Sequence, residues 1–131
     1  MHIQKFRKLN VWAKAMDFTE CVYKISHKFP KDEMYGLTSQ IRRASTSIAL
    51  NIAEGSGADS DKEFNRFLAI SLRSAYEVMC AMELAKRLKY CNLQEYDIIS
   101  KQCDELSAML SGLKKYLNSP QSSAISRQKC L

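Results

Sequence analysis

Residues that interrupt helices are scarce in this sequence, which has four glycines and two prolines among 131 residues. Because proline and glycine are the least favourable residues inside a helix, their scarcity predicts a few long helices. No segment shows the alternation of apolar and polar residues that is typical of a half-buried strand. The sequence therefore favours an all-α protein.

Residue patterns that support catalysis are also missing. The two histidines, His2 and His27, lack the Glu-x-x-His pairs that build metal centres in helical bundles, and no motif surrounds either of them. Gly55 and Gly57 follow a predicted helix, without the lysine and hydroxyl of a phosphate-binding loop. We therefore expect no enzymatic activity, no metal and no cofactor.

Paired cysteines and long apolar runs are absent as well. The five cysteines are an odd number without a C-x-x-C pair, which argues against a disulfide framework or a zinc site and favours a reducing compartment. The opening MHIQKFRKLN holds no apolar signal core, and no apolar run reaches the roughly 18 to 20 residues that span a bilayer. We expect a cytoplasmic protein that does not interact with membranes.

What the sequence does contain is apolar residues at steps of three and four, the spacing of one helix face. Four such stripes predict four helices. The first two run over about 10–28, where Pro30 follows, and about 33–55, where Gly55 and Gly57 supply a stop. The third begins at a Ser60–Glu63 capping box and ends near Lys89, and the fourth runs from Asn92, with Glu95 in the first turn, to Asn118.

These helices are joined by short connections, of roughly 4 to 6 residues, which favour antiparallel neighbours. We predict one domain over 1–118, an antiparallel up-down-up-down four-helix bundle. The last stretch, 119–131, is polar and unpatterned and is predicted to be a disordered tail.

The second predicted helix contains the stretch SQIRRASTSIALNIAEGSG, which is rich in alanine and serine. Its core stripe is Leu37, Ile41, Ala44, Ile48 and Ile52. A polar strip beside this stripe includes Arg43, Asn51 and Glu54. A partly buried asparagine needs hydrogen-bond partners, so the strip is interpreted as joining helices, with Glu77 as a partner for Arg43. The alternative is that the strip presents a ligand site.

Small and apolar residues outside the core stripes predict a contact between subunits. They lie beside the second stripe and behind the third, and comprise Ala49, Ala53, Ile70, Ala81, Leu84 and Leu88. Apolar surface that a single bundle leaves exposed usually marks an interface. Because the two surfaces are unlike, a head-to-tail contact that closes into a homo-oligomeric ring is expected.

The charge balance is basic, with 20 Lys and Arg against 14 Asp and Glu and a formal net charge of +6. Such a balance is compatible with nucleic acid as a partner and equally with an ordinary solvated surface. The candidate cations for a phosphate-binding surface are Arg42, Lys62, Arg66 and Arg73.

Three motifs carry a resemblance to a known family. They are F-P-x-x-E, Y-G-L-T-x-Q-I-R-R-A and S-I-x-x-N-I-A-E-G, present here as Phe29, Pro30, Glu33, 35–38, 40–44, Ser47, Ile48 and 51–55. With the flanking helices, this pattern over about 6–117 resembles the four-helix bundle proteins encoded in intervening sequences of bacterial 23S ribosomal RNA genes.

The resemblance implies a homopentameric barrel with a basic surface and no enzymatic activity. It extends to the accessory variability protein of diversity-generating retroelements, which implies nucleic acid and a reverse transcriptase as partners if this chain is encoded in such an element. Two functional classes remain open: an accessory protein that binds structured RNA or DNA, including ribosomal RNA, and a structural adaptor that gathers protein partners.

Overall fold

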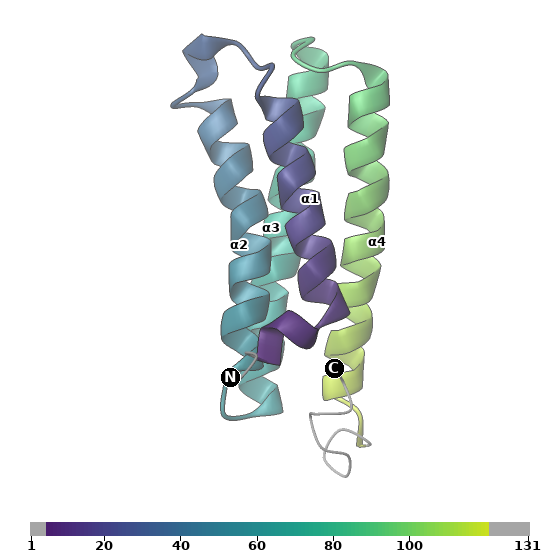
Figure 1. Ribbon diagram of the computed structural model, residues 1–131. Coiled ribbons are helices and arrows are strands. Elements are labelled where there is room, and N and C mark those ends of the chain that lie inside the picture. Colours follow the sequence, from purple (N-terminus) through teal and green to yellow (C-terminus); the bar gives the residue numbers. More distant parts are fainter. Residues whose placement is uncertain (1–4, 121–131) are drawn as a thin grey trace.

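The computed structural model describes residues 5–120, which form four α-helices and two short 3-10 helices (Figure 1). In chain order they are η1 (Lys5–Lys8), α1 (Asn10–Ser26), η2 (Lys31–Glu33), α2 (Leu37–Ser56), α3 (Asp61–Arg87) and α4 (Leu93–Leu117). This part of the chain contains no strand, so the predicted all-α, four-helix architecture is confirmed. Most of the predicted tail, 121–131, lies outside the described residues.

The helices form a bundle in which each helix packs against its neighbours in the sequence, and α1 also packs against α4. The α1–α2 and α3–α4 connections lie at one end of the bundle (Figure 1). The α2–α3 connection and η1 lie at the other end. The bundle therefore has four sides, and the α1–α2 and α2–α3 sides share helix α2.

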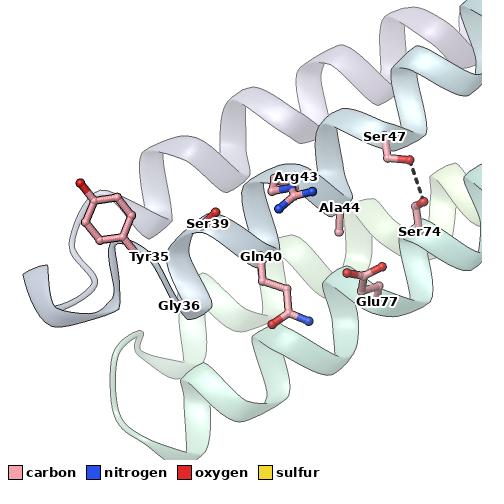
Figure 2. Close-up of a pocket in the computed structure, with 9 residues that line it drawn as sticks. All are labelled: Tyr35, Gly36, Ser39, Gln40, Arg43, Ala44, Ser47, Ser74 and Glu77. Carbon is pink, nitrogen blue, oxygen red and sulfur yellow. Dashed lines mark hydrogen bonds between the residues drawn. The ribbon is translucent and has the colours of Figure 1, made fainter.

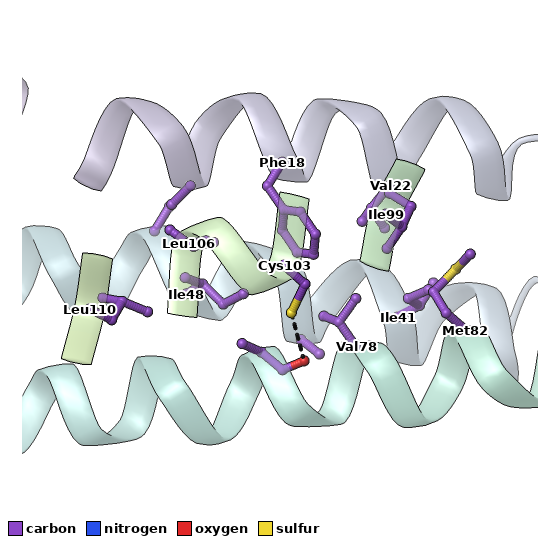
Figure 3. Close-up of a cluster of buried hydrophobic side chains, with 14 of the residues drawn as sticks. Phe18, Val22, Ile41, Ile48, Val78, Met82, Ile99, Cys103, Leu106 and Leu110 are labelled. Atoms are coloured by element: carbon purple, nitrogen blue, oxygen red, sulfur yellow. Dashed lines mark hydrogen bonds between the residues drawn. The ribbon is translucent and has the colours of Figure 1, made fainter. Parts of the chain in front are cut away.

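The core follows the predicted stripes. All five residues of the α2 stripe are buried, and Ile48 and Ile52 have no exposed surface. They pack in a cluster with Phe18 of α1, Val78 of α3 and Leu106 of α4 (Figure 3). Burial of apolar area from all four helices is the main term that stabilises the fold.

Small polar residues allow α2 to approach two neighbours closely. Ser45 and Ser71 are completely buried. Ser71 Oγ donates to the Ile48 carbonyl at 2.9 Å, and Thr19 Oγ1 donates to the Ser45 carbonyl at 3.1 Å. The Ser45 hydroxyl donates to the Arg42 carbonyl at 3.0 Å, so both buried hydroxyls have a partner. The alanine and serine content of α2 thus serves close packing on both sides.

The starts of α3 and α4 agree with the sequence, whereas both ends of α2 differ from it. Asn92 and Glu95 form the full capping box, whereas Ser60 accepts from the Glu63 amide only. The predicted start at 33 was wrong, because Glu33 lies in η2 and α2 begins at Leu37. Gly55 is inside α2, so it is Gly57 that caps the helix.

Glu33 joins the α1–α2 connection to the α3–α4 connection, which lies at the same end of the bundle. Its carboxylate accepts hydrogen bonds from the Leu37 amide at 3.0 Å and from the Tyr90 hydroxyl at 2.8 Å. Both bonds favour the charged form, and they hold the pKa of Glu33 below its ordinary value of 4.5. The carboxylate thus replaces a cap at the start of α2, where the N-cap residue is Gly36.

We expect Glu33→Gln to lower the melting temperature at neutral pH, because the amide loses the charge that strengthens both bonds. A folded-state pKa below the unfolded value stabilises the protein above pH 4.5, and this contribution is lost as the pH falls through the lowered pKa. The difference in melting temperature between wild type and variant should therefore shrink on acidification below pH 4.5. Thermal unfolding across pH checks this, and a constant difference would contradict it.

Candidate functional site

A groove of about 560 Å³ runs between α2 and α3 (Figure 2). Its lining residues are Tyr35, Gly36, Ser39, Gln40, Arg43, Ala44, Ser47, Ser74 and Glu77. We call it the α2–α3 groove. Ala44, Ser47 and Ser74 contribute small side chains to its lining, and Ser74 Oγ donates to Ser47 Oγ at 3.0 Å. Arg43 on α2 and Glu77 on α3 supply its charges.

The polar strip of α2 joins helices through Ser47. Asn51 is half-buried, and its Nδ2 donates to the Ser47 carbonyl at 2.8 Å and to Ser47 Oγ at 3.0 Å. Because Ser47 Oγ also accepts from Ser74, the three side chains form a chain of hydrogen bonds across α2 and α3. The link from Asn51 to α3 is therefore indirect.

Arg43 and Glu77 do not form the predicted pair. Both line the α2–α3 groove and both are exposed, but no ion pair joins them within the described residues. Glu54, the third charged residue of this set, is exposed near the end of α2 and does not line the groove. The helix wheel placed these charges on one strip correctly but could not give the distance between side chains on two helices.

Arg42 holds the end of α1 and lies apart from the other predicted phosphate-binding cations. Its Nε donates to Ser26 Oγ at 2.8 Å, and Nη2 donates to the Tyr23 carbonyl at 3.2 Å. The guanidinium also stacks over the Tyr23 ring, 4.7 Å from its centroid. A guanidinium that satisfies carbonyls in the last turn of a helix stabilises that helix. We therefore remove Arg42 from the candidate nucleic-acid surface.

The remaining predicted cations lie on α3 and define the α3 basic strip: Lys62, Arg66 and Arg73. Arg66 pairs with Glu63 at 2.5 Å, and this hydrogen bond lowers the pKa of Glu63. The Arg66 guanidinium also lies 4.8 Å from the centre of the Phe67 ring. Lys62 and Arg73 are exposed, with no ion pair among residues 5–120. These two cations are free to contact a phosphate.

The sequence analysis missed a second group of cations. Lys5, Arg7 and Lys8 of η1 are all exposed, and η1 lies at the same end of the bundle as the α2–α3 connection, which Lys62 follows (Figure 1). Three cations among four residues were the available signal. Because η1 packs against α1 and α2, these cations add basic charge at this end of the bundle outside the α3 basic strip.

The predicted interface residues divide into two groups. Ala49 and Ala81 are only 5% and 6% exposed within a single chain, so their assignment to a subunit contact was wrong. Both face neighbouring helices of their own bundle. Ala53 and Ile70 are half-buried, while Leu84 and Leu88 are 47% and 46% exposed and remain available to a partner.

A second groove, of about 470 Å³, lies on the α1–α2 side and was not predicted. We call it the α1–α2 groove; it is lined by Met16, Thr19, Glu20, Tyr23, Lys24 and Thr46. Met16 and Tyr23 are 40% and 43% exposed. Both residues lie outside the core stripe of α1. Apolar residues outside that stripe were the sequence signal that could have revealed this groove.

Within residues 5–120, no three His, Cys, Asp or Glu side chains gather closely enough to hold a metal ion. None of the helices described combines the length and apolar character needed to cross a bilayer.

Comparison with known proteins gives two findings. Residues 7–112 match the family model described as 23S rRNA-intervening sequence protein. A crystal structure of a protein of unknown function from the S23 ribosomal protein family of Bacteroides thetaiotaomicron is similar in fold, with a TM-score of 0.72 and 29% identity. The similarity covers 80% of this chain and 98% of that chain. No curated protein matched.

Proposed function

The chain belongs to the 23S rRNA-intervening sequence protein family, and from this premise we propose that it is a non-enzymatic, oligomeric accessory protein that binds structured RNA or DNA through a basic surface. Ribosomal RNA is one candidate ligand. If the gene lies in a diversity-generating retroelement, a reverse transcriptase is a second partner, and the neighbouring genes test this point. The cytoplasm is the proposed location.

The observation that carries this proposal is the exposure of the α3 basic strip. Lys62 and Arg73 are exposed and form no ion pair among the described residues, while η1, at the same end of the bundle as the start of α3, adds the exposed Lys5 and Lys8. Cations that are not neutralised within the fold can contact phosphates without the cost of breaking an internal pair. Contacts of this kind give affinity that depends weakly on base sequence and strongly on salt.

Reversing both free charges, in Lys62→Glu with Arg73→Glu, should weaken binding to duplex DNA and to structured RNA. Each lost phosphate contact should reduce the slope of log K against log salt concentration by about 0.9 for B-DNA, so the double variant should lose about two units of slope. Fluorescence anisotropy at several salt concentrations measures the effect.

The matched control is Lys31→Glu with Lys101→Glu, which makes the same change of net charge at exposed positions of η2 and α4. If the control weakens binding as much as the α3 variant, net charge rather than the α3 basic strip is responsible. If wild type binds neither nucleic acid at low salt, the proposal fails and the adaptor function takes its place.

The proposed assembly is a homopentameric ring. It is supported by exposed apolar side chains on two different sides of the bundle, Met16 and Tyr23 on α1 and Leu84 and Leu88 on α3. Unlike faces that meet head to tail close into a ring when the rotation between subunits permits it. These faces also favour the alternative, a structural adaptor, because the same apolar surface can bind other proteins.

A further inference from the structure

A small pocket lies at the α1–α2 connection, at the opposite end of the bundle from η1 and the start of α3 (Figure 1). We call it the connection pocket. Helix α2 contributes Thr38 and Arg42 to its lining, about one turn apart, and the other lining residues lie between 26 and 34. Its volume is about 200 Å³, below the roughly 300 to 1,000 Å³ of sites for whole organic ligands. The pocket therefore fits a small ion or a single chemical group.

One nearly buried hydroxyl of this pocket has no partner in the protein. Thr38 is 7% exposed, and its hydroxyl makes no hydrogen bond within residues 5–120. In the same part of the chain, Gln102 Oε1 is the one side-chain oxygen or nitrogen that lacks a partner and is sealed from solvent. The Thr38 hydroxyl therefore remains accessible, through the pocket that Thr38 lines. Such a hydroxyl is free to donate to a ligand.

The backbone of the same residue offers a second donor. An α-helix leaves its first four amides without partners inside the helix. In α2 the Leu37 amide donates to a carboxylate and the Gln40 amide to a carbonyl, but the Thr38 amide donates to no atom of the described chain. Both free donors of Thr38 thus lie at the positive end of the α2 dipole, where an anion is stabilised.

The charged side chains that line the connection pocket are positive. Arg42 uses two of its five N–H groups to hold the end of α1, so its position is fixed and three N–H groups stay available. Lys31 is exposed and forms no ion pair within residues 5–120. The acidic residues of the connection, Asp32 and Glu33, lie outside the lining. The pocket therefore combines neutral donors with two cations and no opposing carboxylate.

We propose that the connection pocket binds a phosphate group, as inorganic phosphate or as a phosphate monoester. Thr38 donates to it from its hydroxyl and its amide, while Arg42 and Lys31 supply the opposite charge. A phosphate monoester presents three strong acceptor oxygens, which match this number and variety of donors. The site lies at the other end of the bundle from Lys62 and takes one phosphate group, so it is distinct from the α3 basic strip.

Thr38→Val tests the site, because valine keeps the shape of threonine and removes only the hydroxyl. This hydroxyl has no protein partner, so without phosphate the variant should melt at or above the wild-type temperature. Inorganic phosphate, titrated against sodium chloride at equal ionic strength, should raise the melting temperature of wild type. The Kd obtained from this titration should be about tenfold weaker in Thr38→Val, which loses one hydrogen bond to a charged group.

Lys31→Ala tests the same pocket from an exposed position that does not affect the core. Loss of one cation beside the phosphate should weaken binding about fivefold, as expected for two charges about 4 Å apart in water. The matched control is Lys101→Ala, on exposed α4 surface outside the pocket, which should leave the Kd unchanged.

Three results would overturn the proposal. The first is a wild-type protein that phosphate stabilises no more than chloride does. The second is a Thr38→Val variant that keeps the wild-type Kd. The third is a lower melting temperature of this variant without phosphate, which would show that the hydroxyl already has a structural role.

Two RNA oligonucleotides of one sequence, with a 5′-phosphate and with a 5′-hydroxyl, identify the source of the phosphate. Tighter binding of the phosphorylated strand that is lost in Thr38→Val would support the site and assign it to the end of a nucleic acid. Equal binding of both strands, together with the response to inorganic phosphate, would support the site and assign it to a free phosphate or a phosphorylated small molecule. The salt-dependent binding assigned to Lys62 and Arg73 is measured separately, so either proposal can fail while the other stands.

Discussion

Gly55→Ala is expected to destabilise the bundle, although alanine is normally the better helix former. A Cβ at this position would lie 2.8 Å from Phe67 Cβ and 2.8 Å from Phe64 Cδ1 of α3. Phe67 Cβ is fixed to its backbone, so the two helices must separate near their connection. Overpacking of this kind costs about 1 to 3 kcal/mol, which exceeds the propensity gain of at most about 1 kcal/mol.

Gly112→Ala is the matched control, because it makes the same substitution inside α4 with no atom within 4 Å of the new Cβ. Here the propensity gain stands alone, and the variant should be more stable than wild type by about 0.5 to 1 kcal/mol. Urea unfolding of both variants measures the two free energies. Shifts of the same sign would show that close approach at Gly55 does not limit the packing of α2 on α3.

Leu84→Glu is expected to dissociate the proposed ring while leaving the monomer folded. The side chain is 47% exposed on α3, so glutamate is tolerated within one chain. At a subunit contact, the same change removes burial of the exposed half of the side chain, worth about 1 kcal/mol, and introduces a charge that must be desolvated. Every contact of a ring carries this loss, and the mass from light scattering at micromolar concentration should fall to that of a monomer.

Leu93→Glu is the control for this experiment. Leu93 is 67% exposed at the first turn of α4, where a carboxylate interacts favourably with the helix dipole. The variant should keep both its fold and its oligomeric mass. An unchanged mass for Leu84→Glu would place the subunit contact elsewhere, and a reduced helix content would show that Leu84 supports the bundle itself.

Ala49 shows where reasoning from one helix fails. A helix wheel gives the direction of a side chain around its own axis, and Ala49 lies beside the core stripe as predicted. It cannot show that the chain's own helices already cover that direction, which leaves Ala49 5% exposed. Ala81 fails for the same reason, whereas Leu84 and Leu88, further from the core, remain exposed.

The reach of long charged side chains was the second source of error in assigning residues to surfaces. Arg42 was assigned to a phosphate-binding surface, yet its guanidinium reaches the end of α1 and satisfies Ser26 and Tyr23. Arg43, the next residue, points to the α2–α3 groove and has no ion-pair partner among the described residues. Two adjacent arginines of α2 thus have different surroundings, because helical geometry directs them to different sides of the bundle.

The sequence by itself determined the helical class, the four apolar stripes and the capping signals at Ser60 and Asn92. These features depend on local periodicity and on hydrogen bonds between residues close in the chain, which is information that a single sequence carries. Only the tertiary structure decided which small residues are buried, which cations remain free, and that two grooves of unlike chemistry lie on adjacent sides of α2. Those properties depend on side chains from different helices, whose separation is set by packing and not by spacing in the sequence.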